Sequence, residues 1–243
     1  MRKMLGYAKV FYNWKLFKNI SLNYVPEDIS IELTNTCNFK CGFCPQSDPR
    51  HFEILSRSFL SPEQANILML KLREGGIKTN VIHWTLDGEP FINNYIHEIC
   101  KIAINYGFCN FIFSTNGYFC TPDRLSKLPK DNKGVNYTLC IDFCSSKDIF
   151  EKYRGTQDSW EIVRKNVLHI LDNKQYENIH INISDISSFE INNKAILSNN
   201  ITLLKDIFPK SDRLTIGSRE FHNATGFVQG ILEKKKKQNM TYN

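Results

Sequence analysis

Short β-prone runs alternate with helix-like stretches along most of the chain, and this alternation constrains the fold more than any other feature. Six runs predict strands, at residues 29–34, 81–86, 111–115, 135–142, 179–186 and 213–216. Helical patterns lie between them, at residues 61–73, 94–105, 122–128, 160–171 and 194–207. Strands that alternate with helices indicate a parallel α/β sheet. Six units predict a partial (β/α)6 TIM-like open barrel and not a closed eight-stranded one.

The helix expected after residue 60 has unusually clear boundaries. Ser61 is a good N-cap, Pro62 suits the first helical position, and Gln64 completes a capping box. The adjacent Gly75 and Gly76 predict the end of this helix.

Length and composition predict one domain with two basic appendages. The chain has 243 residues, 42% of them apolar, and a net charge of +6. We expect a core over residues 28–222, an amphipathic basic segment at 1–27, and a basic tail at 223–243 that starts a missing C-terminal extension. No stretch resembles a membrane span or a signal peptide, so the expected location is cytoplasmic. Residues 1–20 leave a peripheral position on a membrane surface open.

Three cysteines follow the first predicted strand within eight residues. Cys37, Cys41 and Cys44 have the spacing Cys-x3-Cys-x2-Cys. Cysteine thiolates bind soft metals and iron–sulfur clusters, and such spacings let one loop surround a single inorganic core. Three sulfurs would leave one iron of a four-iron cluster open to another ligand, which suits catalysis better than electron storage.

Two other interpretations of the cysteines are weaker. A structural zinc site normally takes four protein ligands, often from two Cys-x-x-Cys pairs, and this chain has one such pair. A disulfide framework does not fit a long chain without a secretory signal. We expect the other five cysteines to be reduced, buried thiols.

Polar residues stand at the ends of several predicted strands. In parallel α/β folds, binding sites collect beyond the carboxyl ends of the strands. The candidate segments here are the cysteine loop, residues 87–90 (Asp-Gly-Glu-Pro), residues 114–117 (Ser-Thr-Asn-Gly), and Asp142.

Together these segments resemble the radical S-adenosylmethionine superfamily, and the resemblance covers residues 28–222. Gly88-Glu89-Pro90 looks like the element that holds the methionine amino group of the cofactor, with Asp87 in place of its first glycine. Asp142 and Arg154 resemble a pattern of members with a SPASM extension, in which the arginine meets the cofactor carboxylate. Cys140 stands where that pattern has a serine, and no cysteine follows Cys144.

The resemblance implies that Cys37, Cys41 and Cys44 hold a 4Fe–4S cluster. The cofactor-binding residues that it implies for S-adenosyl-L-methionine are Phe43, Asp87, Gly88, Glu89, Ser114, Asn116, Asp142 and Arg154. It also implies catalytic activity that starts with reductive cleavage of S-adenosylmethionine to a 5′-deoxyadenosyl radical, which abstracts hydrogen from a peptide or a sugar or glycan.

The expected partners are therefore the 4Fe–4S cluster, S-adenosylmethionine, a peptide or a sugar or glycan substrate, and an external electron donor. No nucleic-acid partner is expected. Two alternatives stay open. One is a non-catalytic or degenerate iron–sulfur protein, and the other, less favoured, is a zinc-binding nucleic-acid module.

Overall fold

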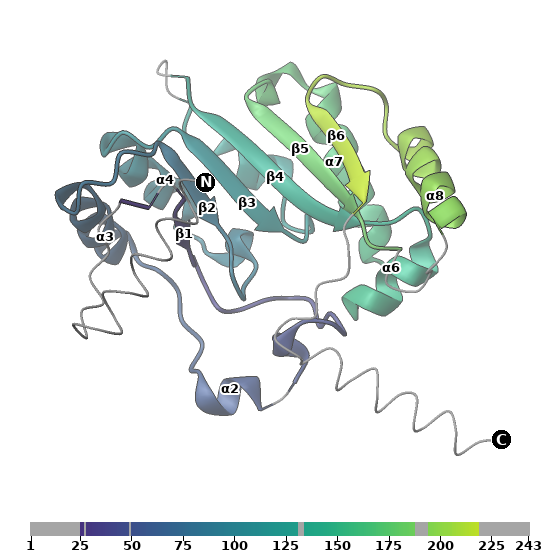
Figure 1. Ribbon diagram of the computed structural model, residues 1–243, viewed down its shortest axis with the longest axis horizontal. Helices are drawn as coiled ribbons and strands as arrows, with labels where there is room; N and C mark the ends of the chain where they lie inside the picture. Colours follow the sequence, from purple (N-terminus) through teal and green to yellow (C-terminus); the bar gives the residue numbers. More distant parts are fainter. Residues whose placement is uncertain (1–24, 27, 49, 131–133, 188–193, 219–243) are drawn as a thin grey trace, which may run out of the picture.

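The computed structural model describes residues 25–26, 28–48, 50–130, 134–187 and 194–218. Its described strands form one parallel sheet in the order β1-β2-β3-β4-β5-β6 (Figure 1). The strands are β1 Ser30–Ile31, β2 Val81–Trp84, β3 Asn110–Thr115, β4 Asn136–Phe143, β5 Ile179–Asp185 and β6 Leu214–Ser218. Each strand pairs with the next along the chain, and no described pairing joins β6 to β1. The predicted open, partial barrel is confirmed.

Helices connect consecutive strands, as parallel pairing requires. They are α2 His51–Ile54, α3 Pro62–Glu74, α4 Ile96–Asn105, α5 Pro122–Ser126, α6 Lys147–Arg154, α7 Ser159–Asp172 and α8 Lys194–Ile207, with short 3-10 turns η1 Pro45–Ser47, η2 Pro90–Ile92 and η3 Lys174–Tyr176. The capping box of α3 is present in full, since Ser61 Oγ accepts from the Gln64 N–H and Gln64 Oε1 accepts from the Ser61 N–H.

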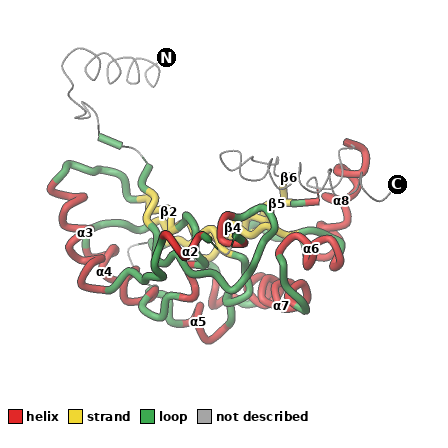
Figure 2. Tube along the Cα trace, turned by 90° about the horizontal axis from the view of Figure 1, so that it is seen from below, coloured by secondary structure: helices red, strands yellow, loops and turns green. Residues whose placement is uncertain are grey.

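The helices cover one face of the sheet. Figure 2 shows α3, α4, α5 and α7 on the same side of the strands. Burial alternates along β4: Tyr137, Leu139, Ile141 and Phe143 are buried, and the residues between them are half-buried. Successive side chains of a strand point to opposite faces, so the core lies between the sheet and this helical layer.

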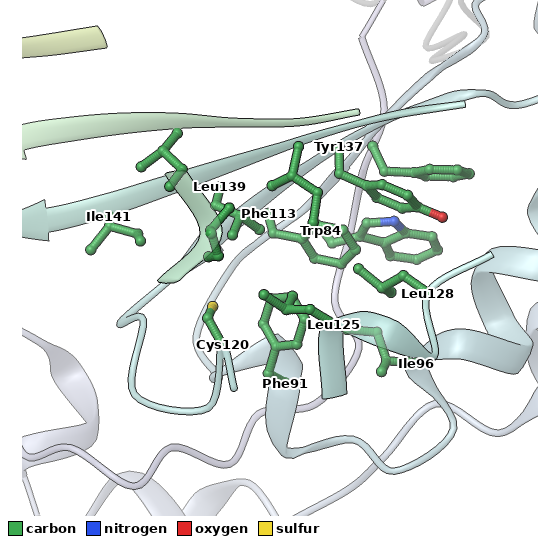
Figure 3. Packing of buried hydrophobic residues seen from close by; sticks show 14 of the residues in the cluster. Trp84, Phe91, Ile96, Phe113, Cys120, Leu125, Leu128, Tyr137, Leu139 and Ile141 are labelled. Atoms are coloured by element: carbon green, nitrogen blue, oxygen red, sulfur yellow. The ribbon is translucent and has the colours of Figure 1, made fainter. Parts of the chain in front are cut away.

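Aromatic and aliphatic side chains fill that core. Trp84, Phe113 and Tyr137 extend from three neighbouring strands toward Phe91 and Leu125 (Figure 3). The Phe113 ring lies 5.1 Å from the Phe91 ring, centroid to centroid. The more polar side chains of the strands lie on the opposite face of the sheet.

The first strand is shorter than the sequence predicts. Only Ser30 and Ile31 pair with β2, whereas the β-prone run predicted a strand over residues 29–34. Thr34 instead forms an antiparallel bridge with Phe59, and the Leu60 N–H donates to the Leu33 carbonyl at 2.9 Å. The chain beyond β1 is thus held by the segment that returns from the cysteine loop.

Two helices were absent from the sequence prediction. Both α2 and α6 are short, and the apolar pattern of α6 is carried by few residues. The signals that did mark α6 are its ends, because Ser146 caps the Ile149 N–H and Gly155 ends the helix in the left-handed region. The predicted basic appendages fall largely outside the described residues.

No described helix combines the length and apolar character needed to cross a bilayer.

Candidate functional site

The cysteine loop lies at the carboxyl end of β1, beside the loops that follow β2, β3 and β4. Its backbone is held by the end of α6. The Lys40 N–H donates to the Arg154 carbonyl at 3.2 Å, and the Gly42 N–H donates to the Tyr153 carbonyl at 3.0 Å. Segments more than 100 residues apart in the sequence (40–42 and 153–154) therefore fix the shape of the loop.

Gly155 makes this close approach possible. Its φ is +60°, and a Cβ atom at this position would lie 2.1 Å from the Lys40 carbonyl oxygen. Both the backbone conformation and the contact exclude larger residues. Gly155, which directly follows the predicted site residue Arg154, thus has a structural role in docking the cysteine loop.

Arg154 is buried beneath the same loop. Its Nη1 lies 3.5 Å from Asp142 Oδ2, and its guanidinium lies 5.4 Å from the centre of the Phe39 ring. The side chains of Arg154 and Asp142 are 7% and 14% exposed, so water screens this pair weakly. The structure therefore brings together two of the predicted site residues.

Residues 88 and 89 pack against the chain that leads into the cysteine loop. A Cβ atom on Gly88 would lie 1.8 Å from the Thr34 carbonyl oxygen, so no other residue fits here. The Glu89 N–H donates to the Thr36 carbonyl at 2.9 Å. The predicted Gly-Glu element is thus joined directly to the strand end from which the cysteines follow.

The Glu89 carboxylate is buried and bound within the protein. Oε1 accepts from Thr115 Oγ1 at 2.7 Å and from the Phe91 N–H at 3.1 Å, while Oε2 accepts from the Asn116 N–H at 2.6 Å. Burial raises the pKa of Glu89, and these three donors act against that rise. Glu89 thus connects the loops after β2 and β3.

Asn116 continues this connection to the cysteines. Its Nδ2 donates to Asn38 Oδ1 at 2.8 Å and lies 3.8 Å from Cys37 Sγ. The Phe39 N–H donates to the same sulfur at 3.4 Å. A continuous path of hydrogen bonds therefore runs from the Glu89 carboxylate to the first cysteine.

Gln46 and Glu32 belong to the site, although the sequence did not single them out. Gln46 is 3% exposed, and its Nε2 donates to the carbonyls of Asn35, at 2.9 Å, and of Asp87. Glu32 Oε1 accepts from the Asp87 N–H at 2.9 Å. Long-range contacts of this kind leave no local pattern in a sequence, apart from the position of Gln46 just after the third cysteine.

The remaining predicted residues lie around this centre. Ser114 is exposed on the sheet face that points away from the helices, where it pairs in register with Cys140. Phe43 is half-buried and packs against the core. Asp87 Oδ2 lies 3.4 Å from His51 Nε2 on α2.

Burial disfavours the thiolate form of all three loop cysteines. Burial raises the pKa of Cys37 to about 11, and it also raises the pKa values of Cys41 and Cys44. Among the described residues, no group of three or more His, Cys, Asp or Glu side chains could hold a metal ion.

Several buried polar atoms near the loop have no hydrogen-bond partner in the described part of the chain. They include Thr36 Oγ1, Gln46 Oε1 and Arg154 Nε. Buried polar groups normally find a partner, and an exception calls for an explanation. One donor and two oxygen atoms lacking partners beside one loop indicate a place where a polar ligand binds.

Comparison with known proteins identifies the family of this arrangement. Residues 31–184 match the model of the "Radical SAM superfamily". A GTP 3′,8-cyclase from Helicobacter pylori (strain HPAG1) is 24% identical over 219 residues, which cover 88% of this chain and 63% of that protein. A protein from Methanocaldococcus jannaschii that is named as a glycyl-radical enzyme activating enzyme is 28% identical over 151 residues. The match covers 59% of this chain and 54% of that protein. The chain thus spans between half and two thirds of the length of these curated relatives.

Solved structures give a similar picture of the fold. TYW1 with a lysine-pyruvate adduct bound superposes with a TM-score of 0.49 at 17% identity, over 80% of this chain and 63% of that one. BtrN in complex with AdoMet and 2-DOIA gives a TM-score of 0.47 at 18% identity, over 80% and 70%. Both scores lie below 0.5, and the architecture described above rests on the strand pairing itself.

Proposed function

The chain belongs to the radical SAM superfamily, and we propose that it is an enzyme that cleaves S-adenosylmethionine reductively and abstracts hydrogen from a peptide or a sugar or glycan. In this superfamily, a 4Fe–4S cluster and S-adenosylmethionine together supply the 5′-deoxyadenosyl radical that removes the hydrogen atom. The observation that carries the proposal is the docking of the Cys37–Cys44 loop onto Arg154 and Gly155, beside the Gly88-Glu89 element.

The cluster ligands in this proposal are Cys37, Cys41 and Cys44. The end of α6 holds the loop backbone at Lys40 and Gly42, and Gln46, just after the third cysteine, binds the Asn35 carbonyl that precedes the loop. Because burial raises their pKa values, each thiol must lose a proton when iron binds.

The buried atoms lacking partners suit the amino acid end of S-adenosylmethionine. That end carries a carboxylate and an ammonium group. Arg154 Nε is a donor for a carboxylate, and an arginine fork fits such a group well. The oxygen atoms of Thr36 and Gln46 are acceptors for an ammonium. The residues present thus fit the cofactor chemically.

The open face of the sheet supports a polar substrate without phosphate groups. Ser114, Cys140, Asn182 and Thr215 form one register row across β3 to β6 on the face that points away from the core. None of the described strands contains a lysine or an arginine. Hydroxyl and amide groups pair well with the backbone of a peptide or the hydroxyls of a sugar. Several relatives are named for GTP. Binding of its triphosphate would require positively charged side chains in the substrate site.

Anaerobic reconstitution tests the proposed enzyme. We expect about four irons per chain, and 5′-deoxyadenosine should form when a strong reductant and S-adenosylmethionine are added. Replacing all three loop cysteines by alanine should remove both iron and product, whereas Cys100→Ala, a change in the buried core, should keep them. Iron bound without 5′-deoxyadenosine would favour a non-catalytic cluster protein instead.

The substrate class has its own test. Acceptor peptides, neutral sugars and GTP can be compared as stimulators of 5′-deoxyadenosine formation in the same preparation. Faster turnover with a peptide or sugar supports the proposal, and stimulation by GTP alone would overturn this part of it.

A further inference from the structure

We propose that the side-chain amide of Asn116 donates a hydrogen bond to the Cys37 sulfur and thereby raises the reduction potential of the cluster. This inference rests on the proposed function, because it concerns the cluster that the three loop cysteines would hold. It gives Asn116 a role toward the cluster, distinct from the contact with S-adenosylmethionine that the sequence suggested.

The contact joins the end of β3 to the first cluster ligand. Asn116 Nδ2 lies 3.8 Å from Cys37 Sγ, within the range of a hydrogen bond to sulfur, and donates its other hydrogen to Asn38 Oδ1 at 2.8 Å. An amide nitrogen carries two hydrogens, so both contacts can exist together. The Phe39 N–H, at 3.4 Å, is a second donor to the same sulfur.

The orientation of the amide is fixed by its other atoms. Asn116 Oδ1 accepts from the Tyr118 N–H at 2.9 Å, so the amide oxygen faces its own turn and the nitrogen must face the cysteine loop. The Asn116 N–H is held by Glu89 Oε2 at 2.6 Å. The residue is 4% exposed. The donor is therefore in place before a cluster arrives.

A donor at a ligand sulfur acts on the charge of the cluster. Reduction adds one electron, and part of that charge resides on the sulfur ligands. An N–H group directed at such a sulfur stabilises the reduced state more than the oxidised state, and hydrogen bonds to the sulfurs are among the factors that set cluster potentials. Burial strengthens the effect because the surrounding dielectric constant is low. Asn116 should therefore make the cluster easier to reduce.

Two substitutions at this position separate charge from packing. Asn116→Ala removes the donor. Asn116→Asp keeps the size of the side chain and the acceptor for the Tyr118 N–H, but directs a negative oxygen at the sulfur. We expect the midpoint potential to fall in the order wild type, Asn116→Ala, Asn116→Asp.

Asn166 offers a matched control in the same region. Its Nδ2 donates to the carbonyls of Gly117 and Tyr118 at 2.9 and 3.0 Å, so it supports the same turn without contact with a loop cysteine. Asn166→Ala should lower the melting temperature and leave the midpoint potential unchanged.

The measurement is an anaerobic redox titration of the reconstituted full chain, followed by electron paramagnetic resonance without S-adenosylmethionine. Hyperfine spectroscopy of protein labelled with ¹⁵N-asparagine provides a second readout. Asn38, which follows Cys37 directly, carries the label in every variant, so a nitrogen coupling that is present in the wild type and absent from Asn116→Ala would support the contact. Equal potentials in wild type and both Asn116 variants, or an equal shift in Asn166→Ala, would overturn the inference. A wild-type protein that holds no four-iron cluster would refute the proposed function itself, and this inference with it.

Discussion

Replacement of Gly155 by alanine should detach the cysteine loop from α6. The added Cβ would lie 2.1 Å from the Lys40 carbonyl oxygen, and real Cβ contacts essentially never fall below 3.0 Å. The carbonyl must therefore retreat by about 1 Å, the difference between these two distances. That movement acts on the two backbone hydrogen bonds that join residues 40 and 42 to residues 154 and 153.

The expected cost has two parts. An alanine in the left-handed region costs roughly 1–2 kcal/mol. Loss of two hydrogen bonds adds about 0.5–1.5 kcal/mol each. Gly155→Ala should thus cost roughly 2–5 kcal/mol. Gly134 provides the control, because its φ is +77° and a Cβ there would meet no atom of the described residues within 4 Å. Gly134→Ala should cost only the roughly 1–2 kcal/mol of the backbone conformation.

Urea unfolding and iron content measure the two consequences separately. Gly155→Ala should lose more unfolding free energy than Gly134→Ala, or should bind less iron after reconstitution if only the loop opens. Equal stability losses in the two variants, together with full iron content in both, would refute the argument that α6 shapes the cysteine loop.

Three further predictions concern other parts of the molecule. Arg154→Ala should weaken S-adenosylmethionine binding by about 10–100-fold, the equivalent of one charge-assisted contact. Arg164→Ala, which removes a half-buried ion pair with Glu161, should leave binding unchanged, and equal dissociation constants for the two variants in a dialysis assay would contradict this. Burial raises the pKa of Asp185, so the wild type loses stability as the pH rises from the unfolded pKa, about 4, through the folded pKa. Asp185→Asn should therefore gain stability relative to wild type as the pH rises over this range in urea unfolding, and a gain that shrinks with pH would be the wrong sign. Ser61→Ala should cost about 1 kcal/mol by loss of the α3 N-cap, with no change in iron content.

The sheet was predictable because each of its strands has a local sequence pattern that is typical of a strand. Alternation of strand and helix patterns fixed the fold class, and the cap signals of α3 placed its start at the correct residue. The length of β1 was overestimated because a β-prone run does not show which segment its backbone pairs with. In the folded protein Thr34 pairs with Phe59, a contact that depends on the return path of the chain.

The site was predictable in its residues and not in its connections. The family resemblance assigned Cys37 and Glu89 to a common site, yet no local pattern shows that the Glu89 carboxylate would bind the Asn116 N–H. Gln46 was missed for the same reason, since its two acceptors lie 11 and 41 positions away in the sequence. Side chains that join distant loops become visible only once the loops are placed.

The cysteine loop follows the least extensively paired strand of the described sheet. β1 contributes two residues to the sheet, whereas β5 contributes seven and is paired on both sides. Native proteins open locally where few contacts hold them, and opening free energies rise toward the best-packed elements. The loop can therefore open for maturation while β3 to β5 remain folded. In the proposed enzyme, a cluster held by the closed loop would shift this local equilibrium by mass action. Amide hydrogen exchange near residues 30–44 should then slow on iron loading far more than exchange in β4.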